Sequence, residues 1–286
     1  MGCLRSRCIY VKSLILLCFP KHWGAGARMQ MQSVFDKYLK IELISLAAIF
    51  ILWELIGELK IVPSYLFPSF SETLSALYSL AVSGRLGLNY FATLVRVLVG
   101  FGLGSSLGIL TGLAIAYHEK SYWAFFPMVA LAYAVPAVAW IPLFIIWIGL
   151  NEGLPIAVIF MCSFSPLVYI VSTSVRGLNP SIINVAKTLG CGDLDLTFRV
   201  LLPQILPSVM SGLKVEMGMA WRSCFVTEMV ALSSGLGLLA IEAQTILRVD
   251  IILAVVLLLA VSNYAFQVLF EKIEIKILRK WGYLNA

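Results

Sequence analysis

The stretch that decides the fold runs from Asn179 to Pro207 and reads NPSIINVAKTLGCGDLDLTFRVLLPQILP. It is a long polar interruption in a chain that otherwise consists of apolar segments. Asn179 followed by Pro180 is typical of a helix N-terminus, because asparagine caps free amides and proline needs no N–H partner there. The apolar face of this first helix is formed by Ile182, Val185, Ala186 and Leu189. Gly190 predicts its end, since glycine adopts a positive φ without strain.

A second short helix is expected to follow, with Asp193 as a suitable N-cap. Its apolar residues are Leu194, Phe198, Leu201 and Leu202. Pro203 and Pro207 predict that the helix ends there. Together the two helices predict a compact amphipathic elbow on a membrane surface, which suits docking better than catalysis. A membrane-surface hairpin without a partner is the simpler alternative.

The composition is that of a membrane protein. Of 286 residues, 60% are hydrophobic and 13% are charged, and the mean hydropathy is +0.95; soluble proteins carry about 25% charged residues. A bilayer core needs about 20 apolar residues per helix. The predicted spans are Ile41–Leu59, Asn89–Tyr117, Ser121–Leu150, Leu154–Val175, Ser208–Leu232 and Ile251–Phe270. We therefore expect an all-α membrane protein with about six transmembrane helices.

Lysine and arginine are distributed unequally between the loops. Residues 1–40, 118–122, 176–214 and 271–286 together hold sixteen, whereas the alternate loops hold three. The positive-inside rule then places both termini and the elbow in the cytoplasm. The net charge of +6 follows from this topology, so no nucleic-acid partner is needed to explain it.

Residues 1–40 are expected to form a cytoplasmic extension that is partly disordered or that precedes the true start. A short apolar run after basic residues resembles the beginning of a signal peptide, and Met1-Gly2 with Ser6 matches a myristoylation pattern, but the run lacks a small-residue cleavage site. The six cysteines show no CxxC spacing and the two histidines are far apart. Neither a disulfide framework nor a metal site is predicted.

Four glycines at every fourth position of the second span predict a close helix contact, either inside the subunit or with a partner. They are Gly100, Gly104, Gly108 and Gly112. Before that span, Ser69 and Glu72 are spaced as a capping box for a short helix that reaches about Val82.

Charged residues inside predicted spans are the first place to look for function. In the fifth span Trp221 and Glu228 share a helical face, and Arg222 lies off that face. No GxxxxGK[ST], HExxH or GxSxG pattern occurs in the sequence. ATP-driven transport would therefore need another chain to bind the nucleotide.

Ala186, Gly190 and Pro203 have a spacing that resembles the EAA loop of ABC importer permeases, in which Glu-Ala-Ala, three residues, Gly and nine residues precede Ile-x-Leu-Pro. The departures are Asn184 for the glutamate, Val185 for the first alanine and Val200 for the isoleucine. In that family the loop contains the coupling helix, which sits in a cleft of the ATPase subunit. The resemblance implies an ATPase contact by Asn184, Val185, Ala186, Gly190, Gly192, Phe198 and Pro203.

A series of short motifs covers about residues 41–280. They are Arg96 with Gly100-Phe101, Pro136 with Trp140-Ile141-Pro142-Leu143 and Trp147-x-Gly149, Gly212-Leu213, Ala220-Trp221, Glu228-Met229 and Gly235-Leu236-Gly237. Their order and spacing resemble the permeases of the nitrate/sulfonate/taurine group of ABC importers. This resemblance implies the membrane subunit of a type I ABC importer, working by alternating access as a homodimer with two ATPase subunits and an extracytoplasmic binding protein.

The resemblance also implies a domain organisation. The permease domain would cover residues 41–271, with the coupling loop at 176–207 and a cytoplasmic tail at 272–286. The chain would be a multi-pass protein of the bacterial inner membrane, would not be an enzyme and would bind no cofactor itself. ATP and Mg²⁺ would be held by the partner ATPase.

Trp221, Arg222, Glu228 and Trp140 are implied to line or gate the translocation path. The alternative, equally weighted, is that Glu228 forms a structural pair with an arginine and that Trp221 anchors an interface. Among whole-protein alternatives, an ion-coupled secondary transporter would show inverted repeats, and a membrane enzyme would show convergent catalytic residues. The expected solute is small and anionic or zwitterionic; an organic sulfonate such as taurine is preferred by analogy alone.

Overall fold

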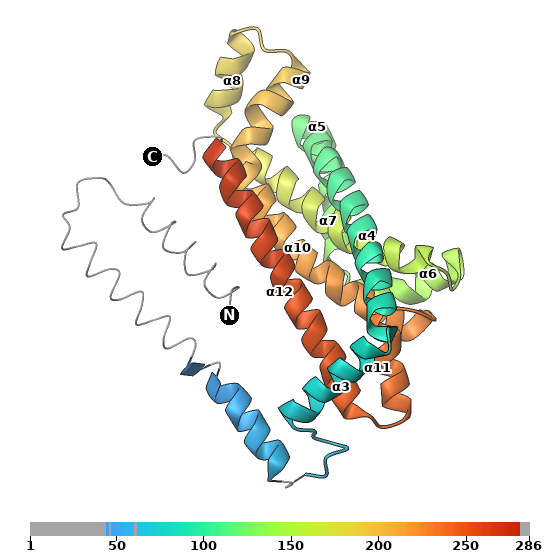
Figure 1. Ribbon diagram of the computed structural model, residues 1–286. Helices are drawn as coiled ribbons and strands as arrows, with labels where there is room; N and C mark the ends of the chain where they lie inside the picture. The colour runs from blue at the N-terminus through green and yellow to red at the C-terminus, as the bar shows by residue number, and fades with distance from the viewer. Residues whose placement is uncertain (1–43, 46, 60–61, 281–286) are drawn as a thin grey trace, which may run out of the picture.

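The computed structural model describes residues 44–45, 47–59 and 62–280, and these residues contain helices but no strand. Four long helices run beside one another and form the body of the molecule (Figure 1). They are α4 (Arg85–Tyr117), α7 (Gly153–Arg176), α10 (Leu202–Ala231) and α12 (Val249–Lys280). In the described part of the chain, four helices are long and apolar enough to cross a membrane, or five if a bent pair counts as one span. The all-helical membrane fold predicted from the sequence is confirmed.

Helices α4 and α7 lie in backbone-close contact along the four glycines. A Cβ added at Gly100 would lie 2.7 Å from Ile159 Cβ, and one at Gly112 would lie 2.7 Å from Val171 Cβ. The two pairs between them are Gly104 with Ser163 and Gly108 with Leu167. Each pair is separated by the same 59 residues, so the two helices run parallel without a change of register. The glycine stripe therefore packs inside this subunit.

The chain returns between these two parallel helices through a broken helix. Helix α5 (Glu119–Ala134) and the segment formed by η1 (Ala137–Ala139) and α6 (Trp140–Ile148) meet at 92°. The break lies at Pro136, because a proline disfavours helical geometry in the residue before it, and Val135 is extended at φ −77° and ψ 123°. The predicted third span, Ser121–Leu150, is thus a bent element and not one straight helix.

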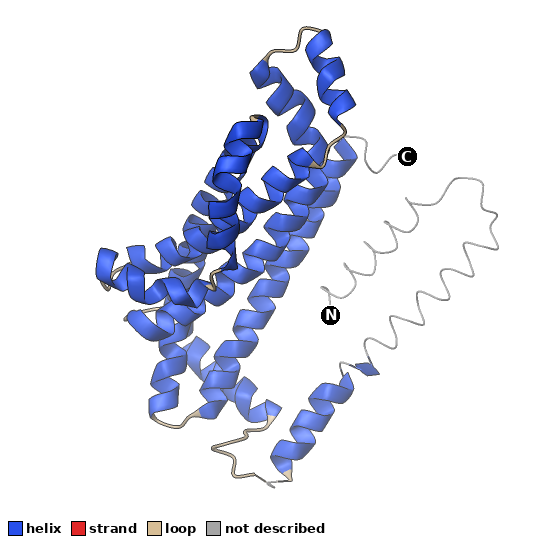
Figure 2. Ribbon diagram, turned by 180° about the vertical axis from the view of Figure 1, so that it is seen from behind, coloured by secondary structure: helices blue, strands red, loops and turns tan. Residues whose placement is uncertain are grey.

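The elbow forms largely as predicted at one end of the bundle, where α8 (Pro180–Thr188) and α9 (Asp193–Asp195) project (Figures 1 and 2). Asn179 Oδ1 accepts a hydrogen bond from the Ser181 amide at 2.9 Å, so it caps α8. Gly190 has φ +81°, the left-handed conformation expected after this helix.

Two details of the elbow were predicted wrongly. Gly192, not Asp193, occupies the N-cap position of α9, and it provides no side-chain cap. The second helix also does not end at Pro203 and Pro207. It continues through the π-helix η2 (Leu196–Leu201) directly into α10, because the wide π turn precedes Pro203 and accommodates a residue that cannot donate a backbone hydrogen bond.

Two short helices, α3 (Phe70–Val82) and α11 (Leu236–Thr245), lie at the end of the bundle opposite the elbow (Figure 1). The predicted capping box of α3 is present, since the Ser69 side chain accepts from the Glu72 amide and the Glu72 side chain accepts from the Ser69 amide. A helix at residues 47–58 stands apart from the body and contacts the start of α3. The predicted first span, Ile41–Leu59, lies partly outside the described residues, as does the tail at 272–286; the extension at 1–40 lies wholly outside them.

Candidate functional site

A buried group of polar side chains joins α4 to the far end of α10. The Glu228 carboxylate, which is 0% exposed, accepts hydrogen bonds from Arg96 Nη1 at 2.7 Å and from Gly237 N at 3.0 Å. Thr93 Oγ1 lies 2.9 Å from both carboxylate oxygens. A buried carboxylate needs such partners, because an unpaired charge in a low-dielectric interior is strongly unfavourable. Arg96 also binds Glu152 and Ser234. We call Thr93, Arg96, Glu152, Glu228 and Ser234 the polar hub.

Arg96 links this buried carboxylate to the loop before α7. Its Nε and Nη2 donate to the two oxygens of Glu152 at 2.6 and 2.7 Å, in a bidentate arrangement. It also donates to the backbone oxygen and the side chain of Ser234. The Arg96 side chain is 3% exposed and that of Glu152 is 70% exposed. Hydrogen bonding to Arg96 lowers the pKa of Glu152, which lies outside the spanning segments, and so keeps it ionised.

The turn between α10 and α11 closes over the hub because of its glycines. Gly235 has φ +112° and its amide donates to Asn89 Oδ1 at 2.7 Å. A Cβ at Gly235 would overlap the Glu228 carboxylate, and one at Gly237 would overlap the backbone of α10. The Leu236 amide donates to Thr93 Oγ1 at 2.9 Å. The turn can therefore lie this close to the carboxylate because neither glycine carries a side chain.

The residues predicted for the path occupy different environments. Trp221 is 0% exposed in the subunit core, where its ring lies against Tyr90 and Phe266 at centroid distances of 6.2 and 5.6 Å. Trp140 is half-buried and stacks on Phe144. Arg222 is exposed on the surface of α10. The hub contains Glu228 but neither tryptophan, so the geometry supports the structural alternative for Glu228.

Most residues predicted for the coupling contact are exposed on the elbow. They are Asn184, Val185, Gly190, Gly192 and Phe198. Ala186 is half-buried against the apolar cluster at the base of the elbow, and Pro203 is buried at the start of α10. The exposed fractions of Val185, Phe198 and Leu189 are 56%, 49% and 81%. An element outside the bundle with several large apolar side chains exposed has the character of a docking surface.

Sequence reasoning did not identify the partners of Glu228. Asn89, Thr93 and Arg96 recur at intervals of four and three residues. This periodicity indicates that the three polar side chains share one face of α4. Glu152 lies in the short loop Gly149-Leu150-Asn151-Glu152, and nothing in this sequence marks it as a partner of Arg96. Its place beside Arg96 depends on the register of α7 against α4.

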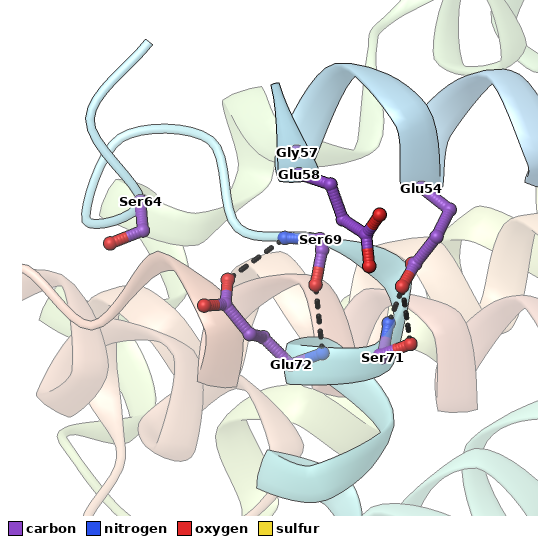
Figure 3. Close-up of a pocket in the computed structure, with 7 residues that line it drawn as sticks. All are labelled: Glu54, Gly57, Glu58, Ser64, Ser69, Ser71 and Glu72. Carbon is purple, nitrogen blue, oxygen red and sulfur yellow. Dashed lines mark hydrogen bonds between the residues drawn. The ribbon is translucent and has the colours of Figure 1, made fainter. Parts of the chain in front are cut away.

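A pocket of about 410 Å³ lies between the helix at 47–58 and the start of α3 (Figure 3). Glu54 accepts hydrogen bonds from Ser71 Oγ at 2.5 Å and from Ser71 N at 3.0 Å, and Glu72 is used by the capping box. In the described residues, no group of three or more histidine, cysteine, aspartate or glutamate side chains could hold a metal ion. The Glu54–Ser71 contacts thus join the two helices, and Glu72 stabilises the start of α3.

Residues 104–279 match the model of the family described as the binding-protein-dependent transport system inner membrane component. The chain belongs to this family. It is 30% identical over 226 residues to an ABC transporter permease protein of Methanocaldococcus jannaschii, covering 77% of this chain and 84% of that protein. The resemblance to ABC importer permeases, inferred from the elbow spacing and the ordered motifs, is therefore confirmed.

Several relatives carry names that include a solute. The chain is 27% identical over 235 residues to a Bacillus subtilis protein named as an aliphatic sulfonates transport permease, SsuC, covering 82% of this chain and 85% of that protein. It is 23% identical over 245 residues to the taurine transport system permease protein TauC of Escherichia coli, covering 84% of this chain and 89% of that protein.

Solved ABC importers share the fold. A chain of the inward-facing MetNI methionine ABC transporter superposes with a TM-score of 0.61 at 16% identity, covering 69% of this chain and 98% of that one. A chain of a bacterial ABC transporter involved in the import of alginate superposes with a TM-score of 0.60 at 17% identity, covering 87% of this chain and 99% of that one. At these identities the likeness concerns the fold alone.

Proposed function

We propose that this chain and a second copy of it form the membrane path of an ABC importer for a small organic sulfonate such as taurine. Two ATPase subunits, which bind ATP and Mg²⁺, would dock on the elbows in the cytoplasm. An extracytoplasmic binding protein would deliver the solute at the opposite end. The sulfonate preference rests on the names of relatives such as SsuC and TauC.

The observation that carries the coupling role is the continuity of the elbow with α10. Residues 193–231 form one helical column that passes through the π-helix and into α10 without a loop. At about 1.5 Å per residue this column spans on the order of 55 Å. It ends at the polar hub, where Glu228 is fixed to Arg96 of α4. A displacement applied at the elbow would therefore reach the opposite end of the subunit.

The base of the elbow is attached firmly enough to transmit such a displacement. Leu196, Leu201 and Ile205 are buried in one cluster with Leu113 of α4 and Val171 of α7. The tip, in contrast, leaves its apolar side chains exposed. An ATPase surface that covers Val185 and Phe198 would bury them and push on a rigid base.

The test begins with the tagged full chain, purified gently from native membranes, and identification of the proteins that remain bound. We expect an ATPase with a nucleotide-binding GxxxxGK[ST] sequence. Val185→Asp should lower its recovery about tenfold or more, because burying an unpaired carboxylate costs more than the roughly 1.4 kcal/mol of a tenfold change. Ile246→Asp is the matched control, since Ile246 is 65% exposed at the opposite end.

Failure of the proposal has a distinct signature. If the chain purifies alone and transports solute into vesicles without ATP, it works as a secondary transporter. If an ATPase binds equally well to the wild type, Val185→Asp and Ile246→Asp, the elbow is not the docking surface.

A further inference from the structure

Arg222 is an arginine inside a membrane-spanning helix that has no acidic partner among the described residues. Its Nη1 lies 3.7 Å from Met219 Sδ, a weak acceptor on the preceding turn of the same helix. Arg96, the other arginine within a span, is 3% exposed and is fully occupied by the polar hub. The two intramembrane arginines therefore differ. Arg96 is buried and paired inside the subunit, whereas Arg222 is exposed on its surface.

The outward face of α10 around Arg222 is left uncovered by the described helices of this subunit. Ser211, Val215 and Arg222 are exposed and recur at intervals of four and seven residues, which places them in one stripe. Val215 is 62% exposed and Met219, beside the stripe, is 37% exposed. None of these neighbours carries a negative charge.

The part of α10 just beyond the stripe packs against α6 and the start of α7. Val226, one turn beyond Arg222, packs on the apolar cluster of Ile141, Phe144, Leu154 and Val158, together with Trp140. Arg222 lies nine residues before the end of α10 at Ala231, a rise of about 13 Å. The candidate span Leu196–Ala231 has 36 residues and is longer than a hydrocarbon core of about 30 Å, and Arg222 lies within it rather than at either end.

A guanidinium within a span is unfavourable against lipid, and charged side chains in spans almost always face the bundle interior or a water-filled cavity. Its five donors suit the planar or tetrahedral oxygens of an oxyanion, often two at a time. In a two-fold dimer with this face at the axis, two guanidinium groups would meet across one path. An anion between two such like charges would stabilise both of them.

We propose that Arg222 is the solute-binding residue of the path and that it contacts the oxyanion group of the transported molecule, so that the path selects sulfonates over neutral solutes. This inference rests on the proposed function, because it needs the α10 stripe to face the path. It assigns the selection to Arg222 rather than to Glu228 or Trp221, which are 0% exposed.

The test uses the assembled complex with its ATPase and binding protein in proteoliposomes, and radiolabelled taurine and methanesulfonate as probes. Arg222→Gln should lower uptake of the sulfonates about tenfold or more, the effect of losing charge-assisted hydrogen bonds. Arg222→Lys should keep an intermediate rate, since it retains the charge without the bidentate donors. Val261→Gln is the control, because Val261 is 59% exposed on α12 and lies outside the stripe; this variant should transport as the wild type does.

Three results would overturn the inference while leaving the importer intact. Arg222→Gln could carry sulfonates at the wild-type rate. The wild-type complex could couple ATP hydrolysis to a neutral or cationic solute only. Arg222→Gln could lose the second copy or the ATPase, which would make Arg222 an ion-pair partner between subunits. If instead no ATPase assembles with the wild-type chain, the proposed function itself fails.

Discussion

The Glu228→Gln substitution tests the polar hub most directly. The carboxylate accepts hydrogen bonds from Arg96, Thr93 and Gly237 at 2.7 to 3.0 Å while being 0% exposed. A glutamine has one acceptor oxygen, and its NH₂ group would face donors. The substitution would therefore leave a buried guanidinium without its buried counter-charge.

The size of the effect follows from the second partner of Arg96. Removing one member of a buried ion pair costs about 3–5 kcal/mol. Glu152 stays bound to Arg96, but its side chain is 70% exposed, and exposed pairs contribute only about 0.2–1 kcal/mol. We therefore expect Glu228→Gln to lose about 3 kcal/mol or more and Glu152→Gln to lose about 1 kcal/mol or less.

Thermal unfolding of the detergent-purified protein measures the difference. With roughly 2 °C per kcal/mol for a chain of this size, Glu228→Gln should lower Tm by about 6 °C or more, and Glu152→Gln by about 2 °C or less. Uptake per assembled Glu228→Gln complex should remain measurable, because the carboxylate reaches no open surface. A Glu228→Gln protein as stable as the wild type, or equal losses for both variants, would refute the assignment of Glu228 as the buried anchor.

Two further predictions concern the ionisation of Glu152 and the glycine stripe. Because Arg96 lowers the pKa of Glu152, its stabilisation is present above the ordinary value of 4.5 and is lost as pH falls through the lowered value; the Tm difference between wild type and Glu152→Gln should vanish in acid and not in base. Gly104→Leu should destabilise by about 1–3 kcal/mol or more, because its Cβ would lie 2.7 Å from Phe160 O, a backbone atom that cannot yield. Gly102→Leu is the control, since a Cβ there meets nothing within 4 Å; equal Tm values for the two leucine variants would contradict the packing.

The features predicted correctly from sequence are those decided within a few residues. The capping box at Ser69 and Glu72 and the Asn179 cap of α8 each involve one turn of chain. Gly190 takes the positive φ that only a glycine adopts freely. These contacts depend on the identity and spacing of the residues and not on the rest of the molecule.

The features that could not be predicted depend on tertiary packing. Prolines have opposite effects in different parts of the chain. The chain bends by 92° at Pro136, whereas Pro203 and Pro207 lie within one continuous helical column. The difference is that the π turn and the buried base of the elbow support the column, whereas α5 has no buried residue in this subunit. Likewise Glu152 pairs with Arg96 because the glycine contacts fix the register of α7 against α4.

These contacts also indicate where the subunit can and cannot deform. Four backbone-close positions along α4 prevent it from sliding against α7, because any shift brings a side chain onto a glycine. The hub fixes α10 to α4 at one end, and the apolar cluster under the elbow fixes it at the other. A push on the elbow should therefore move α4, α7 and α10 together as one body. The change of access in this importer would then occur between the two copies, where the uncovered stripe of α10 carries Arg222, and not inside a single copy.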